Sequence, residues 1–298
     1  MPEKPLFQHH VIHGRRGEGP TLLVIAGVHG DEFEGPAACR RLIAETDPDA
    51  LSGNLHVIPM ANESACRCRA RCGSDGLDLA RTFPGRADGS ITERVAHALS
   101  GIIREASAFI DLHSGGTIME VAPLSGYMLV QDAGVLERQR DLAKAFGLPL
   151  AWGTSASLDG RSMSEARDAG IPAIYAEYLG GARCSEEGVA AYVEGCRRVM
   201  AFLGMIDSMP PAPLVPQCVE DTSPGSGHMQ ICHPSPMEGI FVPAVQLGEK
   251  LRRGQPLGVV VDYLGIEQRP IPAERDGRVI VLRTYPRVDA GESVGVIL

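Results

Sequence analysis

Residues 21–32 read TLLVIAGVHGDE, an apolar run that ends in a turn framed by Gly27 and Gly30. A short apolar run bounded by glycine predicts a buried strand over 21–26. His29 and Glu32 lie three residues apart in the turn, so both side chains project to the same side of it. The sequence therefore predicts a strand end that carries two potential metal ligands.

Residues 108–116, AFIDLHSGG, repeat this arrangement, with His113 placed where an apolar run meets a glycine-containing loop. If the two strands are neighbours, His113 joins His29 and Glu32 in a site of two histidines and one carboxylate. Zinc bound by three protein ligands keeps another coordination position open, which distinguishes catalytic from structural zinc. We therefore expect one Zn²⁺ per chain and metal-assisted hydrolysis, although iron(II), cobalt and manganese fit the same ligands.

The composition indicates a globular protein with a large domain and a smaller one. The chain has 298 residues, of which 44% are hydrophobic, and a net charge of −9. The negative charge argues against nucleic acid as a partner, and no apolar run approaches the roughly 18 residues of a membrane helix. Residues 1–16 lack a hydrophobic signal region, so we expect a cytoplasmic protein without a membrane partner. The sequence leaves a homo-oligomer open.

The cysteines do not indicate a disulfide scaffold or a second metal site. A chain of 298 residues contains eight of them, and cytoplasmic cysteines are expected to be reduced. Three cluster at Cys66, Cys68 and Cys72, but this spacing lacks the paired C-x₂-C pattern of structural zinc. We expect reduced cysteines in a loop.

Apolar runs and amphipathic segments alternate from about residue 20 to 205, which predicts an α/β layered domain. A capping box of Ser90 and Glu93 precedes the clearest helix, over 91–106. We expect a catalytic domain over 1–208, a linker over 209–232 and a C-terminal β domain over 233–298. The strands are expected at 21–26, 54–60, 108–112, 127–130 and 173–177, and the other helices at 35–45 and 187–203.

The C-terminal segment contains two glycine-punctuated, valine-rich halves, beginning at Gly239 and at Gly277. This internal repeat predicts a small all-β domain, either a pseudo-symmetric barrel or a sandwich. It resembles the biotinyl/lipoyl barrel-sandwich, but residues 266–271, which link the halves, contain no lysine to be modified. We therefore expect a structural module and not a carrier domain.

The motifs resemble the aspartoacylase/succinylglutamate desuccinylase family, a branch of the zinc carboxypeptidase fold. That family carries a G-x-H-G-[DN]-E motif, matched by Gly27–Glu32, and a later D-x-H block, matched by 111–113. The resemblance covers most of residues 20–205 and implies a mixed sheet flanked by helices, often followed by a C-terminal β domain. The block 122–128 also resembles deacylases of the bacterial ectoine-degradation type, which act on N-acetyl-diaminobutyrate.

The resemblance also implies roles for residues outside the metal motif. The family's general base, a glutamate at a late strand end, is matched by Glu177, and its substrate-contacting arginines by Arg71 and Arg81. A guanidinium suits a carboxylate because its planar fork binds both oxygens. Asn62 matches an early asparagine that also contacts substrate. The family's D-L-N-R motif reads DLAR here, so Ala80 replaces an amide and leaves the substrate specificity open.

We therefore expect a zinc-dependent amidohydrolase that removes a small acyl group from an N-acyl amino acid, with Asp111 orienting a metal ligand. Two alternatives remain. One is a carboxypeptidase-like enzyme acting on short or modified peptides. The other is a non-catalytic protein that binds acyl amino acids, although such a protein has no need of a base at Glu177.

Overall fold

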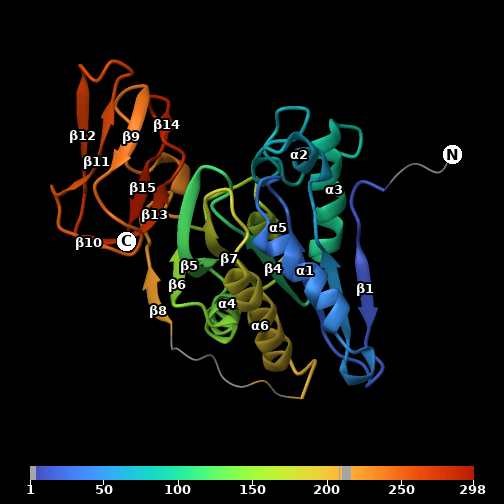
Figure 1. The fold of residues 1–298 in the computed structure, drawn as a ribbon. Helices are drawn as coiled ribbons and strands as arrows, with labels where there is room; N and C mark the ends of the chain where they lie inside the picture. The colour runs from blue at the N-terminus through green and yellow to red at the C-terminus, as the bar shows by residue number, and fades with distance from the viewer. Residues whose placement is uncertain (1–4, 208, 210–215) are drawn as a thin grey trace.

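The computed structural model describes residues 5–207, 209 and 216–298. In this part of the chain a mixed eleven-stranded sheet forms the centre, and a four-stranded antiparallel sheet forms the C-terminal end (Figure 1). The predicted fold class, an α/β core followed by a smaller β region, is confirmed. Among the described residues, no helix is both long enough and apolar enough to span a membrane.

The large sheet runs in the order β1-β3-β2-β4-β7-β5-β13-β10, with β6 beside β5, β8 beside β6 and β15 beside β13. β3, β2, β4 and β7 are parallel neighbours, so their carboxyl ends meet at one edge. The strands from the first part of the chain are β1 (His10–His13), β2 (Thr21–Ala26), β3 (Asn54–Ile58), β4 (Ala108–His113), β5 (Met119–Met128), β6 (Leu150–Thr154), β7 (Ala173–Gly180) and β8 (Gln217–Glu220).

Helices cover both faces of this sheet because its strands are apolar on both sides. α1, α4 and α6 pack on one face around Leu42, Phe146 and Tyr192, and α3 and α5 pack on the other around Leu99 and Met163. The helices are α1 (Glu34–Glu45), α2 (Glu63–Cys68), α3 (Ile91–Arg104), α4 (Ala133–Phe146), α5 (Ser162–Asp168) and α6 (Glu186–Phe202), with 3₁₀ turns η1 (Pro48–Ala50), η2 (Leu79–Arg81) and η3 (Met229–Ile231).

The C-terminal strands form a two-layered β structure. One layer is β12-β11-β9-β14, and the other consists of β10, β13 and β15. Phe241 and Val260 of the first layer share a core with Val279 and Ile297 of the second, as the predicted sandwich requires. The strands are β9 (Gly239–Pro243), β10 (Lys250–Leu251), β11 (Pro256–Val261), β12 (Gln268–Pro272), β13 (Gly277–Arg283), β14 (Arg287–Val288) and β15 (Gly295–Ile297).

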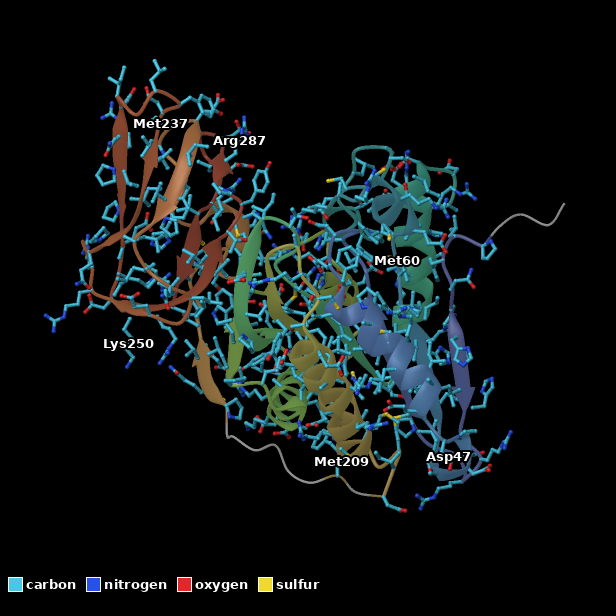
Figure 2. All side chains as sticks on the ribbon, viewed as in Figure 1. Asp47, Met60, Met209, Met237, Lys250 and Arg287 are labelled. Carbon is cyan, nitrogen blue, oxygen red and sulfur yellow. The ribbon has the colours of Figure 1, made fainter. Side chains whose placement is uncertain are left out.

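The layer of β10, β13 and β15 is part of the large sheet, because β13 pairs antiparallel with β5. Figure 2 shows the resulting arrangement, with Met237 and Arg287 at one end of the molecule and Met60 and Asp47 at the other.

Segment 209–232, which we expect to be a linker, contains secondary structure. Its residues 210–215 lie outside the described part, and Gln217–Glu220 form β8, which pairs in parallel with β6. Met229–Ile231 then form the 3₁₀ turn η3. The proposed division into three units remains a prediction.

Candidate metal and hydrolytic site

Two neighbouring parallel strands bring the predicted metal ligands together at one edge of the sheet. His29 and Glu32 lie in the turn after β2, and His113 ends β4, the neighbour of β2. One potential ligand atom from each residue lies within 4.8 Å of the others. Gly30 lets this turn approach α2, because a Cβ there would stand 2.0 Å from the carbonyl carbon of Ala65.

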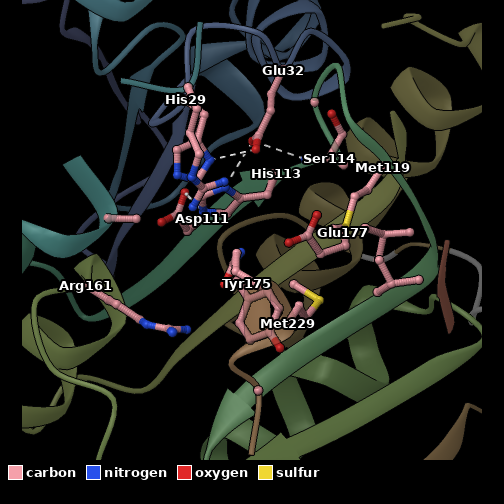
Figure 3. Close-up of a pocket in the computed structure, with 18 of the residues that line it drawn as sticks. His29, Glu32, Asp111, His113, Ser114, Met119, Arg161, Tyr175, Glu177 and Met229 are labelled. Atoms are coloured by element: carbon pink, nitrogen blue, oxygen red, sulfur yellow. Dashed lines mark hydrogen bonds and ion pairs between the residues drawn. The ribbon is translucent and has the colours of Figure 1, made fainter. Parts of the chain in front are cut away.

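Each histidine is held between two carboxylates, and Figure 3 shows Glu32 and Asp111 beside His113. The Nδ1 atoms of His29 and His113 lie 2.6 and 3.0 Å from the two oxygens of Glu32. The Nε2 atoms face away, towards Asp78 at 3.2 Å and Asp111 at 3.1 Å. Both imidazoles therefore present Nδ1 to the same place, while the outer carboxylates fix the orientation of the rings.

The donor set fits a zinc ion. Two imidazole nitrogens and a carboxylate converge in a buried position, where His29 and Glu32 are each 3% exposed. The surroundings favour positive charge. Burial alone would lower the pKa of His113, but Asp111 and Glu32 raise it well above its ordinary value. Burial alone would likewise raise the pKa of Glu32, but the two histidines lower it.

Glu177 lies directly across from His113 in the register of β7 and β4. Its side chain is 6% exposed, and its Oε2 is buried without a hydrogen-bond partner among the described residues. Burial raises the pKa of this carboxyl above its usual range, although the positive charge of His113 opposes the shift. The arrangement leaves an unpaired carboxyl group beside the metal-ligand cluster.

Arg71, Arg81 and Arg161 line the same cavity, which has a volume of about 270 Å³, and a fourth lining arginine, Arg283, pairs with Glu292. Arg71 donates from Nε to Asp78 at 2.9 Å, so Asp78 contacts both His29 and an arginine. Arg81 lies on η2, the 3₁₀ turn that follows Asp78 in the chain. Arg161 is the N-cap residue of α5 and points into the cavity (Figure 3), and its buried Nε has no hydrogen-bond partner among the described residues. Burial and the nearby Arg81 lower the pKa of Arg161 to about 10.

The structure brings six of the seven predicted site residues into one cavity: His29, Glu32, Arg71, Arg81, His113 and Glu177. Asn62 does not line the cavity. It is fully buried at the start of α2, where its Oδ1 accepts a hydrogen bond from the Ala65 amide at 3.0 Å. Cys66 and Cys68 lie on α2, Cys72 lies in the following loop, and all three are free thiols.

Sequence reasoning missed several residues of this site. Asp78, which contacts His29 and Arg71 without lining the cavity, lies in the DLAR block, where only Arg81 and Ala80 were singled out. Arg161 carries no local motif. Gly227, Met229 and Gln230 come from the segment expected to be a linker, yet they line the cavity. Only the tertiary fold brings these last residues to the site, so no pattern of spacing signals them.

Comparison with known proteins assigns the chain to a family. Residues 18–203 match the model of the succinylglutamate desuccinylase/aspartoacylase catalytic domain. The N-alpha-acetyl-L-2,4-diaminobutyric acid deacetylase of Halomonas elongata is 32% identical over 290 residues, which cover 95% of this chain and 83% of that protein.

Solved structures give the same result. A succinylglutamate desuccinylase/aspartoacylase from Rhodobacter sphaeroides superposes with a TM-score of 0.88 at 26% identity, covering 98% of this chain and 88% of that one. The product-bound ectoine utilization protein EutE (DoeB) from Ruegeria pomeroyi gives 0.87 at 28% identity, covering 97% and 87%. This chain therefore belongs to the succinylglutamate desuccinylase/aspartoacylase family.

Proposed function

We propose that the protein hydrolyses the amide bond of a small N-acyl amino acid and depends on zinc held by His29, Glu32 and His113. One observation carries the proposal: a single cavity is lined by a metal-ligand cluster, by Glu177, whose buried Oε2 has no hydrogen-bond partner among the described residues, and by arginines that include Arg71, Arg81 and Arg161. The deacylase names of the relatives support the same reaction class.

Two further carboxylates fix the orientation of the metal-binding histidines. Asp78 accepts a hydrogen bond from Nε2 of His29, and Asp111 from Nε2 of His113, so both rings are held with Nδ1 facing the ion. The hydroxyl of Ser162 in turn donates to Asp111. Zinc bound here would act as a Lewis acid and lower the pKa of a water molecule to about 7.

Glu177 serves as the proton carrier. It accepts a proton from the water that attacks the acyl carbon. It then donates this proton to the amine nitrogen as the C–N bond breaks, so the products are a carboxylic acid and a free amine. Its burial suits this role, because a carboxylate with a raised pKa is a stronger base.

The arginines bind the negative charges of the substrate. Arg71, fixed by Asp78 beside the metal ligands, stabilises the oxyanion that develops on the acyl carbonyl. Arg81 and Arg161 hold the carboxylate of the amino acid. Arg161 fits this task because it is a largely buried cation that has no carboxylate partner in the part of the chain that the structure describes. Apolar side chains such as Met128 and Met163 line the cavity and suit a short acyl group.

The test is release of free amine from a panel of N-acetyl, N-succinyl and N-formyl amino acids. The panel includes N-alpha-acetyl-2,4-diaminobutyrate, because the Halomonas relative is named for it, and a dipeptide series represents the peptidase alternative. We expect release from a few N-acyl amino acids, loss of release after chelation, and its return on adding back one equivalent of zinc. Release that survives complete chelation would contradict the metal assignment, and no release from any acyl amino acid by the zinc-loaded protein would contradict the proposed function.

A further inference from the structure

We propose that Gln230, from the C-terminal part of the chain, is a positioning residue for Arg81 and supplies the amide that position 80 lacks. The inference rests on the proposed function, because it gives Arg81 a substrate-binding task. It assigns a role in the site to a segment that is 149 residues away in sequence.

Two hydrogen bonds fix the Arg81 guanidinium. Nη1 donates to the backbone carbonyl of Ala80 at 2.6 Å, and Nη2 donates to Oε1 of Gln230 at 3.0 Å. The first is a contact within η2, so it cannot by itself aim the guanidinium at the cavity. Gln230 is the side chain that holds the far end of the group, and it lines the cavity itself.

Gln230 is presented by an anchored segment. Ser226 accepts a hydrogen bond from the Ser155 amide at 2.8 Å and donates to the carbonyl of Asp221 at 2.6 Å. Gly227 has φ +85°, and a Cβ there would stand 2.9 Å from the Thr154 side chain. The segment is therefore pressed against the end of β6, which fixes the approach of η3 to the arginines.

The chemistry explains why an amide is suited to this position. Arg71, Arg81 and Arg161 repel one another, and the charges of Arg71 and Arg81 contribute to the lowered pKa of Arg161. A carboxylate at position 230 would restrain Arg81 but also neutralise it. An amide oxygen restrains the guanidinium and leaves its positive charge available to the substrate.

A variant at position 80 can test whether an amide from another residue replaces that of Gln230. Ala80 lines the cavity and directly precedes Arg81 in the chain, so an asparagine at this position would place an amide beside Arg81. If the task is to hold Arg81 with an amide, an asparagine at position 80 can take over from Gln230. A purely structural role for Gln230 in anchoring η3 gives no reason for such a rescue.

The experiment compares the wild type with Gln230→Ala, Ala80→Asn and the double variant, using the zinc-loaded full chain and the best substrate of the panel. We expect Gln230→Ala to raise KM by roughly three- to tenfold, within the range of the net contribution of one hydrogen bond, with kcat within about twofold. The double variant should return KM towards the wild-type value. Ile231→Ala is the matched control, because Ile231 is the next residue, 59% exposed, and does not line the cavity.

A second readout needs no turnover. Phenylglyoxal labelling of Arg81, quantified by peptide mass spectrometry, should be faster in Gln230→Ala than in the wild type or Ile231→Ala, and slower again in the double variant. If the labelling rates change in this way but the protein hydrolyses no member of the panel, the positioning role of Gln230 stands and the proposed function is refuted. Unchanged labelling would overturn the positioning role, and a rise in KM alongside it would make Gln230 a direct substrate contact. Altered labelling with no change in KM, or no rescue by Ala80→Asn, would also overturn the proposal.

Discussion

The carboxyl group of Glu177 lies in an environment that fits its proposed role as a base. It is buried, it faces His113 across two neighbouring strands, and its Oε2 has no hydrogen-bond partner among the described residues. A buried polar atom without a partner is costly, so it persists where function requires it. At Glu177 the function that we propose is proton transfer from the attacking water to the amine nitrogen of the substrate.

Glu177→Gln keeps the size of the side chain but removes its basicity. We expect kcat to fall by about 10²- to 10⁴-fold, the usual contribution of a general acid–base group. The zinc content should not change, because Glu177 is not among the three clustered ligand residues. Steady-state kinetics and metal analysis by mass spectrometry measure the two quantities.

Glu292→Gln is the matched control, since Glu292 lines the same cavity but pairs with Arg283 at 3.0 Å. It should lose far less activity than Glu177→Gln. Equal losses in the two variants, or near wild-type kcat in Glu177→Gln, would refute the assigned base.

At the residue scale, local spacing predicted the metal cluster because its members follow the ends of strands with clear apolar patterns. His29, Glu32 and His113 needed only the correct neighbour relation of β2 and β4 to meet. Arg161 and Gln230 could not be predicted in the same way. Each reaches the cavity through packing between elements that are distant in sequence.

Individual elements show where sequence patterns succeed and fail. The strand at 21–26 was predicted with its observed bounds, because it is a continuous buried run. β5 was expected at 127–130 but occupies Met119–Met128. Proline normally argues against a strand interior, yet Pro123 is accommodated where the register between β5 and β7 shifts, between Val121 and Leu124. α4 was not expected, although Asp132 caps it and Gly147 ends it.

The first turn of helix α3 is capped by a carboxylate that lies outside the helix in the sequence. The predicted capping box contributes the Ser90 amide, which donates to Glu93 at 2.8 Å. Asp75 adds a long-range cap, because it accepts hydrogen bonds from the Thr92 amide at 2.9 Å and the Thr92 hydroxyl at 2.7 Å. Burial alone would raise the pKa of Asp75, but hydrogen bonds from Ser90, Thr92 and the Leu77 amide lower it to about 2.

The lowered pKa makes the contribution of Asp75 depend on pH. Because the carboxylate is favoured in the folded state, its stabilisation is complete above the unfolded pKa of 3.8 and is lost as the pH falls towards 2. Asp75→Asn should lower the free energy of unfolding at pH 7 by about 1 kcal/mol, as expected for a weakened helix cap. The difference from wild type should shrink below about pH 4.

Urea unfolding at pH 7, 5, 4 and 3, followed by circular dichroism, tests this expectation. Asp88→Asn serves as the control, because Asp88 is exposed in the loop before α3. A difference between Asp75→Asn and wild type that stays constant from pH 7 to 3 would show that the charge of Asp75 does not stabilise α3.

The feature of the fold that the sequence predicted least is the junction between the C-terminal strands and the α/β core. The sequence predicted a separate C-terminal β region, and local patterns support the sandwich itself. The pairing of β13 with β5 joins strands about 160 residues apart, through Val281 opposite Val121. Long-range pairing of this kind depends on complementary edges and packing surfaces, which apolar periodicity does not encode.

This junction contains a hydrophobic cluster of its own. Ile280 on β13, which is 1% exposed, packs in one cluster with Leu124 of β5 and Trp152 of β6. Residues of this cluster, including Val121, also line the candidate site, so the junction both stabilises the molecule and closes the cavity. We therefore expect stability and activity to be coupled through it.

Ile280→Ala should lower the free energy of unfolding by about 2–5 kcal/mol, because it removes a buried side chain and leaves a cavity. Ile266→Ala removes the same atoms from a residue that is 80% exposed, so it should change stability by less than about 0.5 kcal/mol. Differential scanning calorimetry measures both variants against wild type. If Ile280→Ala lowers the temperature of one shared transition, the C-terminal strands and the α/β core unfold together. Two separated transitions, or equal effects of the two substitutions, would show that the C-terminal strands are only loosely attached to the core and that the wall they contribute to the cavity is not fixed by this cluster.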